Sequence, residues 1–142
     1  MATIPTEPAP PGEIEIAPLP QRILIVDDEP AILFAYRKLI EKEGIAVDVC
    51  ETHHEAIIHI NARPYFAVIA DMRLVGTDNM DGLKVVRAIR EAQPDTKVIL
   101  VTGYGNKEIV QKALSMGVSY YFEKPVMPAA ILEALKILGE IG

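Results

Sequence analysis

The sequence predicts an α/β domain built on a doubly wound, five-stranded parallel sheet. Five short apolar runs, rich in β-branched or aromatic residues, alternate with amphipathic stretches along the chain. Runs of four or five such residues between turn signals are typical of buried strands, whereas the stretches between them have the length of helices. Strands that alternate with helices imply right-handed crossovers and helices on both faces of one sheet.

The elements can be assigned in chain order. The expected strands cover residues 23–26, 46–50, 66–70, 98–102 and 118–122, and the expected helices lie near residues 30–43, 53–62, 81–92, 106–116 and 128–140. Start signals support these bounds, because Pro30 suits a first helical position and Thr52 has a glutamate three residues later, the spacing of a capping box. Asn106 can cap the fourth helix, and Gly44 and Gly117 favour helix ends.

Composition excludes several classes of protein. The chain has 142 residues, of which 50% are hydrophobic and 24% are charged, the balance of a globular domain. A net charge of -6 without a basic cluster argues against nucleic-acid binding. No apolar run approaches the ~18 residues of a membrane span, and no signal peptide is visible. Cys50 is the only cysteine, which fits a reducing cytoplasm, where we expect the protein to reside.

The chain divides into a tail and one domain. Residues 1–20 hold six of the eleven prolines and no Lys or Arg, so we expect a disordered Pro-rich tail there. The alternation of Glu and Ile over residues 13–16 leaves room for a short docking strand. Residues 21–142 form the expected domain.

Chemically active side chains follow the predicted strands at one end. Asp27 and Asp28 come after the first strand, Asp71 after the third, Thr102 at the end of the fourth and Lys124 after the fifth. The carboxyl ends of parallel strands meet at the same edge of a sheet, where ligands of doubly wound domains bind. We therefore expect three carboxylates, a hydroxyl and a lysine at one site.

Such a cluster needs positive charge. Two carboxylates ~4 Å apart repel by about 4 kcal/mol at an effective dielectric constant near 20. An all-oxygen site with room for water suits Mg²⁺, and a lysine can neutralise further negative charge. A carboxylate nucleophile beside Mg²⁺, a lysine and a hydroxyl is equipped to form an aspartyl-phosphate.

The sequence resembles the receiver domains of CheY-like response regulators. The motifs "ILIVDDEP", "FAVIADMRL", "DGLKVVRAIR", "VILVTGYG" and "YYFEKPV" occur in the order and spacing of that family and span about residues 21–140. The resemblance implies the flavodoxin-like strand order 2-1-3-4-5. It also implies a two-component signalling module that accepts a phosphoryl group from a sensor histidine kinase or a histidine phosphotransfer protein.

The resemblance assigns roles by position. It implies that Asp71 is the phosphoacceptor, and that Asp27, Asp28, Asp71 and the backbone carbonyl of Arg73 bind Mg²⁺. Thr102 would bind a phosphoryl oxygen. Lys124 would pair with the phosphate, with Pro125 following in a cis peptide, and Tyr121 would change rotamer together with Thr102.

Three further positions carry hypotheses. Gly103 matches a small residue that leaves the phosphoryl pocket accessible, and Tyr104 could obstruct an attacking water and lengthen the life of the phosphoryl group. Helical phase places Phe34 on the solvent side of the first helix, opposite the arc of Ile32, Leu33, Tyr36, Leu39 and Ile40. The corresponding helix of receivers usually meets the kinase, so Phe34 is a candidate docking residue.

The sequence departs from the family pattern after Asp71. The usual proline four residues later is Val75, and the Asp81-Gly82 pair comes about three residues later than usual, so we expect an enlarged loop. After Lys124-Pro125-Val126 the chain has room for one more helix, so we expect no DNA-binding output domain and an output through an unidentified protein.

Two alternative functions remain. A Mg²⁺ phosphatase of the haloacid-dehalogenase type also uses an aspartate nucleophile, but its D-x-D-x-T/V motif does not match "DDEPA". A receiver-shaped scaffold that works without phosphorylation would not need all five key residues. The favoured interpretation is not a classical enzyme, because it catalyses only its own phosphorylation and dephosphorylation.

Overall fold

A computed structural model describes residues 21–71, 81–103 and 107–139. Within these ranges the five strands form one parallel sheet in the order β2-β1-β3-β4-β5, as predicted. The strands are β1 (Arg22–Val26), β2 (Ala46–Cys50), β3 (Ala67–Asp71), β4 (Lys97–Thr102) and β5 (Tyr120–Glu123). The helices are α1 (Pro30–Glu41), α2 (His53–Ala62), α3 (Asp81–Ala92), α4 (Lys107–Ser115) and α5 (Pro128–Gly139). The predicted tail at residues 1–20 and the predicted cap Asn106 lie outside the described residues.

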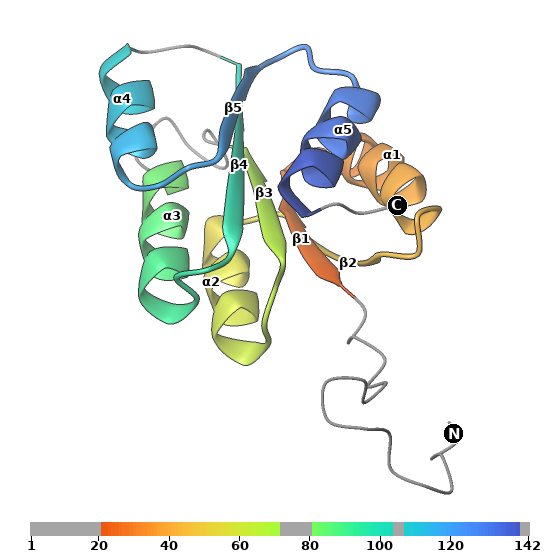
Figure 1. Cartoon of the computed structure of the whole chain (residues 1–142), viewed down its shortest axis with the longest axis horizontal. Coiled ribbons are helices and arrows are strands. Elements are labelled where there is room, and N and C mark those ends of the chain that lie inside the picture. Colours follow the sequence, from red (N-terminus) through yellow and green to blue (C-terminus); the bar gives the residue numbers. More distant parts are fainter. Residues whose placement is uncertain (1–20, 72–80, 104–106, 140–142) are drawn as a thin grey trace, which may run out of the picture.

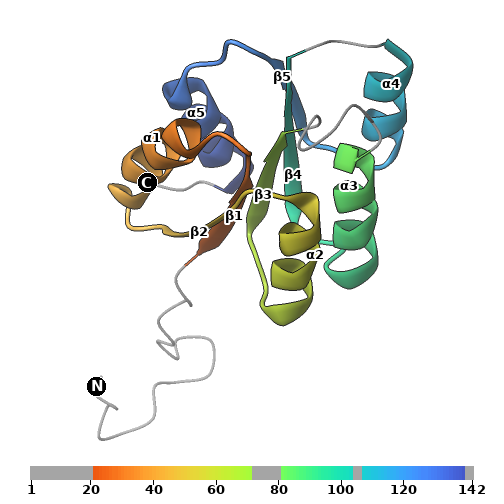
Figure 2. The same cartoon turned by 180° about the vertical axis from the view of Figure 1, so that it is seen from behind.

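Two layers of helices cover the sheet. Helices α1 and α5 lie on one face, and α2, α3 and α4 lie on the other (Figure 1), as the view from behind also shows (Figure 2). Side chains of each strand alternate between the two layers: Ile23 and Ile25 pack with α1 and α5, whereas Leu24 and Val26 pack with α2 and α3. No described helix has both the length and the apolar character that crossing a membrane requires.

The predicted helix signals are confirmed where the structure describes them. Pro30 begins α1, and the backbone N–H of Glu55 donates to the Thr52 side chain at 3.1 Å at the start of α2. Gly44 and Gly117 have φ angles of 82° and 89°, in the left-handed region that favours glycine after a helix. These signals mark the starts of α1 and α2 and the ends of α1 and α4.

Strands β1, β3, β4 and β5 differ from their predicted bounds by one or two residues, and two of these differences have a visible cause. Asp71 is the last residue of β3, because it pairs with Val101 of β4 instead of following the strand as a loop residue. Strand β5 begins at Tyr120, two residues later than expected. The N–H of Val118 still donates to the carbonyl of Ala113 in α4, which keeps this residue in the turn after the helix.

A network around Asp48 of β2 ties strands β1 and β2 to α2 and to the start of β3. The Asp48 carboxylate accepts hydrogen bonds from Arg22 at 2.8 Å, from the Tyr65 hydroxyl at 2.6 Å and from Arg63 at 3.4 Å. Partial burial would raise the pKa of Asp48, but the hydrogen bond from Tyr65 and the charges of Arg22 and Arg63 outweigh it and lower the pKa.

We expect Asp48→Asn to lower the free energy of unfolding by about 2 kcal/mol at pH 7, because both arginines lose their partly buried counter-charge. A lowered pKa stabilises the fold above the unfolded-state value, and this stability is lost as the pH falls below it. Urea unfolding at pH 7 and pH 3 should therefore show a difference between wild type and variant that shrinks in acid. An equal difference at both pH values would contradict this account.

Candidate functional site

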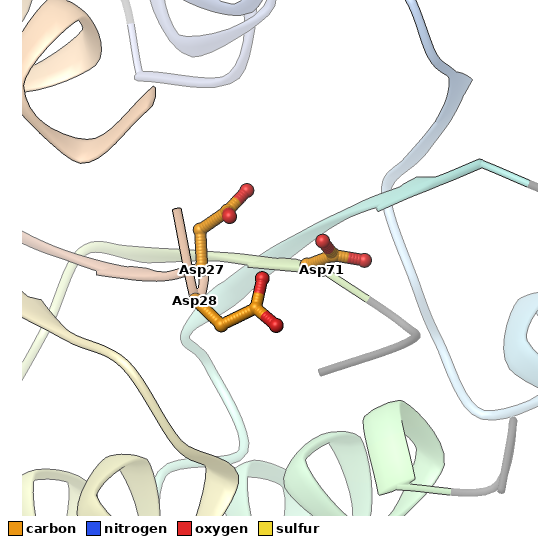
Figure 3. Close-up of side chains that lie close together, drawn as sticks. All are labelled: Asp27, Asp28 and Asp71. Atoms are coloured by element: carbon orange, nitrogen blue, oxygen red, sulfur yellow. The ribbon is translucent and has the colours of Figure 1, made fainter. Parts of the chain in front are cut away.

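Three carboxylates converge at the carboxyl edge of the sheet. Asp27 and Asp28 follow β1, and Asp71 ends the neighbouring strand β3 (Figure 3). Each offers one carboxylate oxygen, and these oxygens all lie within 4.8 Å of one another. Asp27 and Asp71 are each only 4% exposed, whereas Asp28 is exposed. The structure thus brings together the acids that the sequence predicted to meet.

Strand geometry determines which side of the sheet each acid approaches. In β3, the side chains of Ala67 and Ile69 pack toward α1 and α5. Because strand side chains alternate, the side chain of Asp71, at the end of the strand, lies on that same side of the sheet. By the same alternation, the side chain of Asp27 lies on the side of the sheet that Ile23 and Ile25 occupy. Its backbone N–H donates to the carbonyl of Cys50 at 3.1 Å, which keeps this residue attached to β2 beyond the last pair of the ladder.

Lys124 supplies positive charge to the cluster. Its Nζ donates to Asp71 Oδ2 at 2.8 Å and lies 3.7 Å from Asp27 Oδ2 and 3.5 Å from Glu29 Oε1. Burial alone would lower the pKa of Lys124, but the hydrogen bond to Asp71 and the surrounding negative charges raise it. Lys124 is followed by a cis peptide bond to Pro125, as the resemblance implied.

One lysine does not neutralise the site. Burial raises the pKa of Asp27 from 3.8 to about 6, even though the Glu29 N–H donates to its Oδ1 at 2.9 Å and Lys124 attracts it. The carboxylate of Asp71 adds to the increase. The carboxylates of Asp27, Asp71 and the exposed Asp28 form an all-oxygen donor set that fits a hard divalent cation such as Mg²⁺.

Thr102 lies at the same edge but faces the other layer of helices. Val98 and Leu100 of β4 pack toward α2 and α3, and strand alternation puts the side chain of Thr102 on that same side. Thr102 is 3% exposed. Tyr121 of β5 packs against the same cluster. Its hydroxyl oxygen is buried and has no hydrogen-bond partner among the described residues. The N–H of Lys124 donates to the Thr102 carbonyl at 2.7 Å, which joins the two strand ends.

The remaining predicted positions are described in part. Gly103 is exposed, and a Cβ placed there would meet no other atom of the described residues within 4 Å, which fits an open approach to the site. Phe34 is 63% exposed, as helical phase predicted, with Lys38 Nζ 5.3 Å from its ring centroid. Arg73, Tyr104 and the predicted enlarged loop around Val75 lie outside the described residues.

The structure adds two residues to the site that the sequence did not single out. Glu29 contacts Lys124 through its side chain and Asp27 through its backbone N–H. Tyr36 of α1 was expected only to face the sheet; burial raises its pKa, and the charges of Asp27 and Asp71 raise it further. Three consecutive acids could have indicated Glu29 as a member of the cluster. The helical phase of Tyr36 indicated its burial and gave no signal of its place relative to the acids.

Comparisons with known proteins agree with this geometry. The family model described as "Response regulator receiver domain" matches residues 23–136. The photosynthetic apparatus regulatory protein RegA of Rhodobacter capsulatus is 37% identical over 120 residues, which cover 83% of this chain and 62% of RegA. The acid tolerance regulatory protein ActR of Rhizobium meliloti is 37% identical over 113 residues, which cover 80% of this chain and 57% of ActR. The chain therefore spans about three fifths of the length of these relatives.

A solved structure shares the fold and part of the sequence. The crystal structure of a CheY-like response regulator receiver domain protein from Methanospirillum hungatei JF-1 superimposes with a TM-score of 0.78. It is 34% identical to this chain, and the match covers 85% of this chain and 95% of that one. With the family model matching most of its length and the acidic cluster at the carboxyl edge of a 2-1-3-4-5 sheet, this chain belongs to the receiver domains of response regulators.

Proposed function

We propose that Asp71 accepts a phosphoryl group from a phosphohistidine donor in a Mg²⁺-dependent reaction, and that phosphorylation switches the binding of a protein partner. Receiver domains are generally not classical enzymes, and the proposed chemistry of this one is limited to its own phosphorylation and dephosphorylation. The observation that carries the proposal is the position of Asp71, whose buried carboxylate lies between two further acids and Lys124. The proposal includes a cytoplasmic location for the domain, together with such a donor.

The proposed metal ligands are the carboxylates of Asp27, Asp28 and Asp71, together with the backbone carbonyl of Arg73. Bound Mg²⁺ would neutralise the acids and withdraw charge from the transferring phosphoryl group. The exposed side chain of Asp28 leaves one side of the cluster open to solvent, which suits a cation that keeps several waters. The raised pKa of Asp27 reflects the cost of burying its ionised carboxylate, and such a cation would offset that cost.

The chain's own residues perform the transfer. A carboxylate oxygen of Asp71 attacks phosphorus, the bond from phosphorus to the donor histidine nitrogen breaks, and the electron pair of that bond leaves with the imidazole. Lys124 already donates to Asp71 Oδ2, so it is placed to donate to a phosphoryl oxygen once that carboxylate is esterified. In the proposed switch, the hydroxyl of Thr102 takes a second phosphoryl oxygen and Tyr121, on the same side of the sheet, responds.

A mass measurement tests the function. The full chain is incubated with acetyl phosphate, with Mg²⁺ or with EDTA, and the intact protein is weighed. We expect the mass of one phosphoryl group to appear only with Mg²⁺. Steady release of phosphate from added esters would instead favour the haloacid-dehalogenase type of phosphatase. No labelling, and no Mg²⁺-dependent binding of beryllofluoride, would leave the scaffold interpretation.

We further propose that a sensor histidine kinase or a histidine phosphotransfer protein docks on α1 beside the acids. Phe34 is 63% exposed on this helix, four positions after Pro30, which begins α1 directly after the acids. An exposed aromatic side chain is a common anchor of protein interfaces. The output partner is a protein of unknown identity.

Phe34→Ala is expected to slow phosphoryl transfer from the cognate kinase by about tenfold, a typical effect of losing an interface anchor. Labelling by acetyl phosphate and the melting temperature should change little, because the side chain is exposed and is not part of the acid cluster. Ile58→Ala on α2, which removes another exposed apolar side chain (57%) from the opposite layer, serves as the matched control. Equal slowing with both phosphodonors would indicate a damaged site instead.

A further inference from the structure

Glu29 adds a carboxylate to the exposed side of the acid cluster. It follows Asp27 and Asp28 directly and precedes Pro30, which begins α1. Its backbone N–H donates to Asp27 Oδ1 at 2.9 Å, and its backbone is extended, the conformation that a following proline favours. The backbone of Glu29 is therefore held from both sides, by the acid cluster and by the start of the helix.

The side chain of Glu29 contacts Lys124. Glu29 occupies the cap position of α1, yet within the described residues its carboxylate makes no capping hydrogen bond. Its Oε1 lies instead 3.5 Å from Lys124 Nζ, and the side chain is 60% exposed. The same Nζ lies 2.8 Å from Oδ2 of the buried Asp71. Lys124 thus lies between the proposed acceptor and a carboxylate that faces solvent.

The charge of Glu29 is not needed to balance the site. The three carboxylates of the proposed metal site carry three negative charges, which the two positive charges of Mg²⁺ and the one of Lys124 balance. Glu29 is an additional acid beside the same lysine. With the cation bound, the exposed side of the site therefore keeps one negative charge.

An entering phosphoryl group comes close to this charge. Lys124 can donate to a phosphoryl oxygen at about 2.8 Å. Because its Nζ lies 3.5 Å from Glu29, that oxygen would lie no more than about 6 Å from the Glu29 carboxylate. At this separation, in the dielectric of water, one negative charge disfavours another by about threefold in rate or affinity.

We propose that Glu29 is a specificity-determining residue of the phosphoryl transfer, whose carboxylate disfavours small phosphodonors according to their negative charge. The inference rests on the proposed function, because it concerns the donor that reaches Asp71. A protein donor can place a basic side chain beside Glu29 and offset its charge, which a free anion cannot do. The residue therefore favours a protein donor over small anionic ones.

The test compares labelling by two small donors of different charge. Acetyl phosphate is a dianion at neutral pH, whereas the protonated nitrogen of phosphoramidate makes its net charge less negative. The intact mass of the full chain is followed over time at low ionic strength, with Mg²⁺ saturating and each donor well below saturation. Because the donors differ by about one unit of charge, the ratio of the acetyl phosphate rate to the phosphoramidate rate should rise about threefold in Glu29→Gln.

The ratio separates the charge of Glu29 from damage to the site, because a displaced Lys124 or a weakened fold would slow both donors together. Glu91→Gln is the matched control: it removes an exposed glutamate near the end of α3, at the opposite edge of the sheet, and should leave the ratio at its wild-type value. In about 1 M salt, where charges are screened beyond about 3 Å, the ratio in Glu29→Gln should return to that of wild type.

An unchanged ratio in Glu29→Gln, an equal rise in Glu91→Gln, or a rise that persists in high salt would each overturn the specificity role. Failure of wild type to be labelled by either donor would instead overturn the proposed function.

Discussion

Asp71→Asn is expected to abolish labelling by acetyl phosphate. The substitution keeps the size of the side chain and its place at the end of β3, but it removes the carboxylate oxygen that attacks phosphorus. It also removes the charge that Lys124 pairs with at 2.8 Å. In our proposal Asp27 and Asp28 both bind the cation, and Asp27 is also buried, with its Oδ1 accepting the Glu29 N–H, so we expect neither to replace Asp71.

The measurement is the intact mass after incubation with Mg²⁺ and acetyl phosphate. Asp95→Asn, which removes an exposed acid in the turn between α3 and β4, is the matched control and should be labelled like wild type. Labelling of Asp71→Asn to the extent of wild type would place the phosphoryl group on another residue and remove the assignment. The melting temperature of each variant shows that the fold is retained.

Asp27→Asn is expected to stabilise the metal-free protein at neutral pH. Burial holds the pKa of Asp27 at about 6, against 3.8 for the exposed group. A shift of about two units corresponds to about 3 kcal/mol of lost stability when the group is ionised. Asparagine removes this cost and can still accept the Glu29 N–H, although Lys124 loses one attraction at 3.7 Å. We expect a net gain of about 2 kcal/mol.

The sign of the pH dependence makes this prediction specific. A carboxyl group whose pKa is raised on folding costs nothing below the unfolded value near 3.8, and its full cost is present above about pH 6. The stability difference between variant and wild type should therefore grow from pH 4 to pH 6 in EDTA. Saturating Mg²⁺ should stabilise wild type much more than Asp27→Asn. A variant less stable than wild type in EDTA at pH 7 would contradict the account.

The fold was predictable because apolar runs and helix ends are local signals. Each strand is a short β-branched or aromatic run, and Pro30, Thr52 and Gly44 mark helix ends by backbone requirements that act within a few residues. The convergence of Asp27 and Asp71 followed from the parallel sheet alone, since the carboxyl ends of its strands share one edge.

Contacts that depend on side-chain direction were not predictable from those signals. Glu29 has the sequence appearance of a helix cap, yet its side chain makes no capping bond and lies 3.5 Å from Lys124. Tyr36 has the helical phase of a core residue and is buried as predicted, but helical phase did not show that the charge of Asp27 would add to burial in raising its pKa. The start of β5 moved because the end of α4 still engages Val118, a competition between neighbouring elements.

The alternation of strand side chains has a consequence for suppressor genetics. Asp71 ends β3 on the side of α1 and α5, whereas Thr102 ends β4 on the side of α2, α3 and α4, so the proposed acceptor and the proposed reporter meet at one edge of the sheet but adjoin different helix layers. Second-site revertants of a Thr102 substitution should therefore map to α3, α4 or β5. Second-site revertants of an Asp27 substitution should instead map to α1. Loss of one residue from the middle of β4 would exchange the two layers for the positions of β4 after it, Thr102 included.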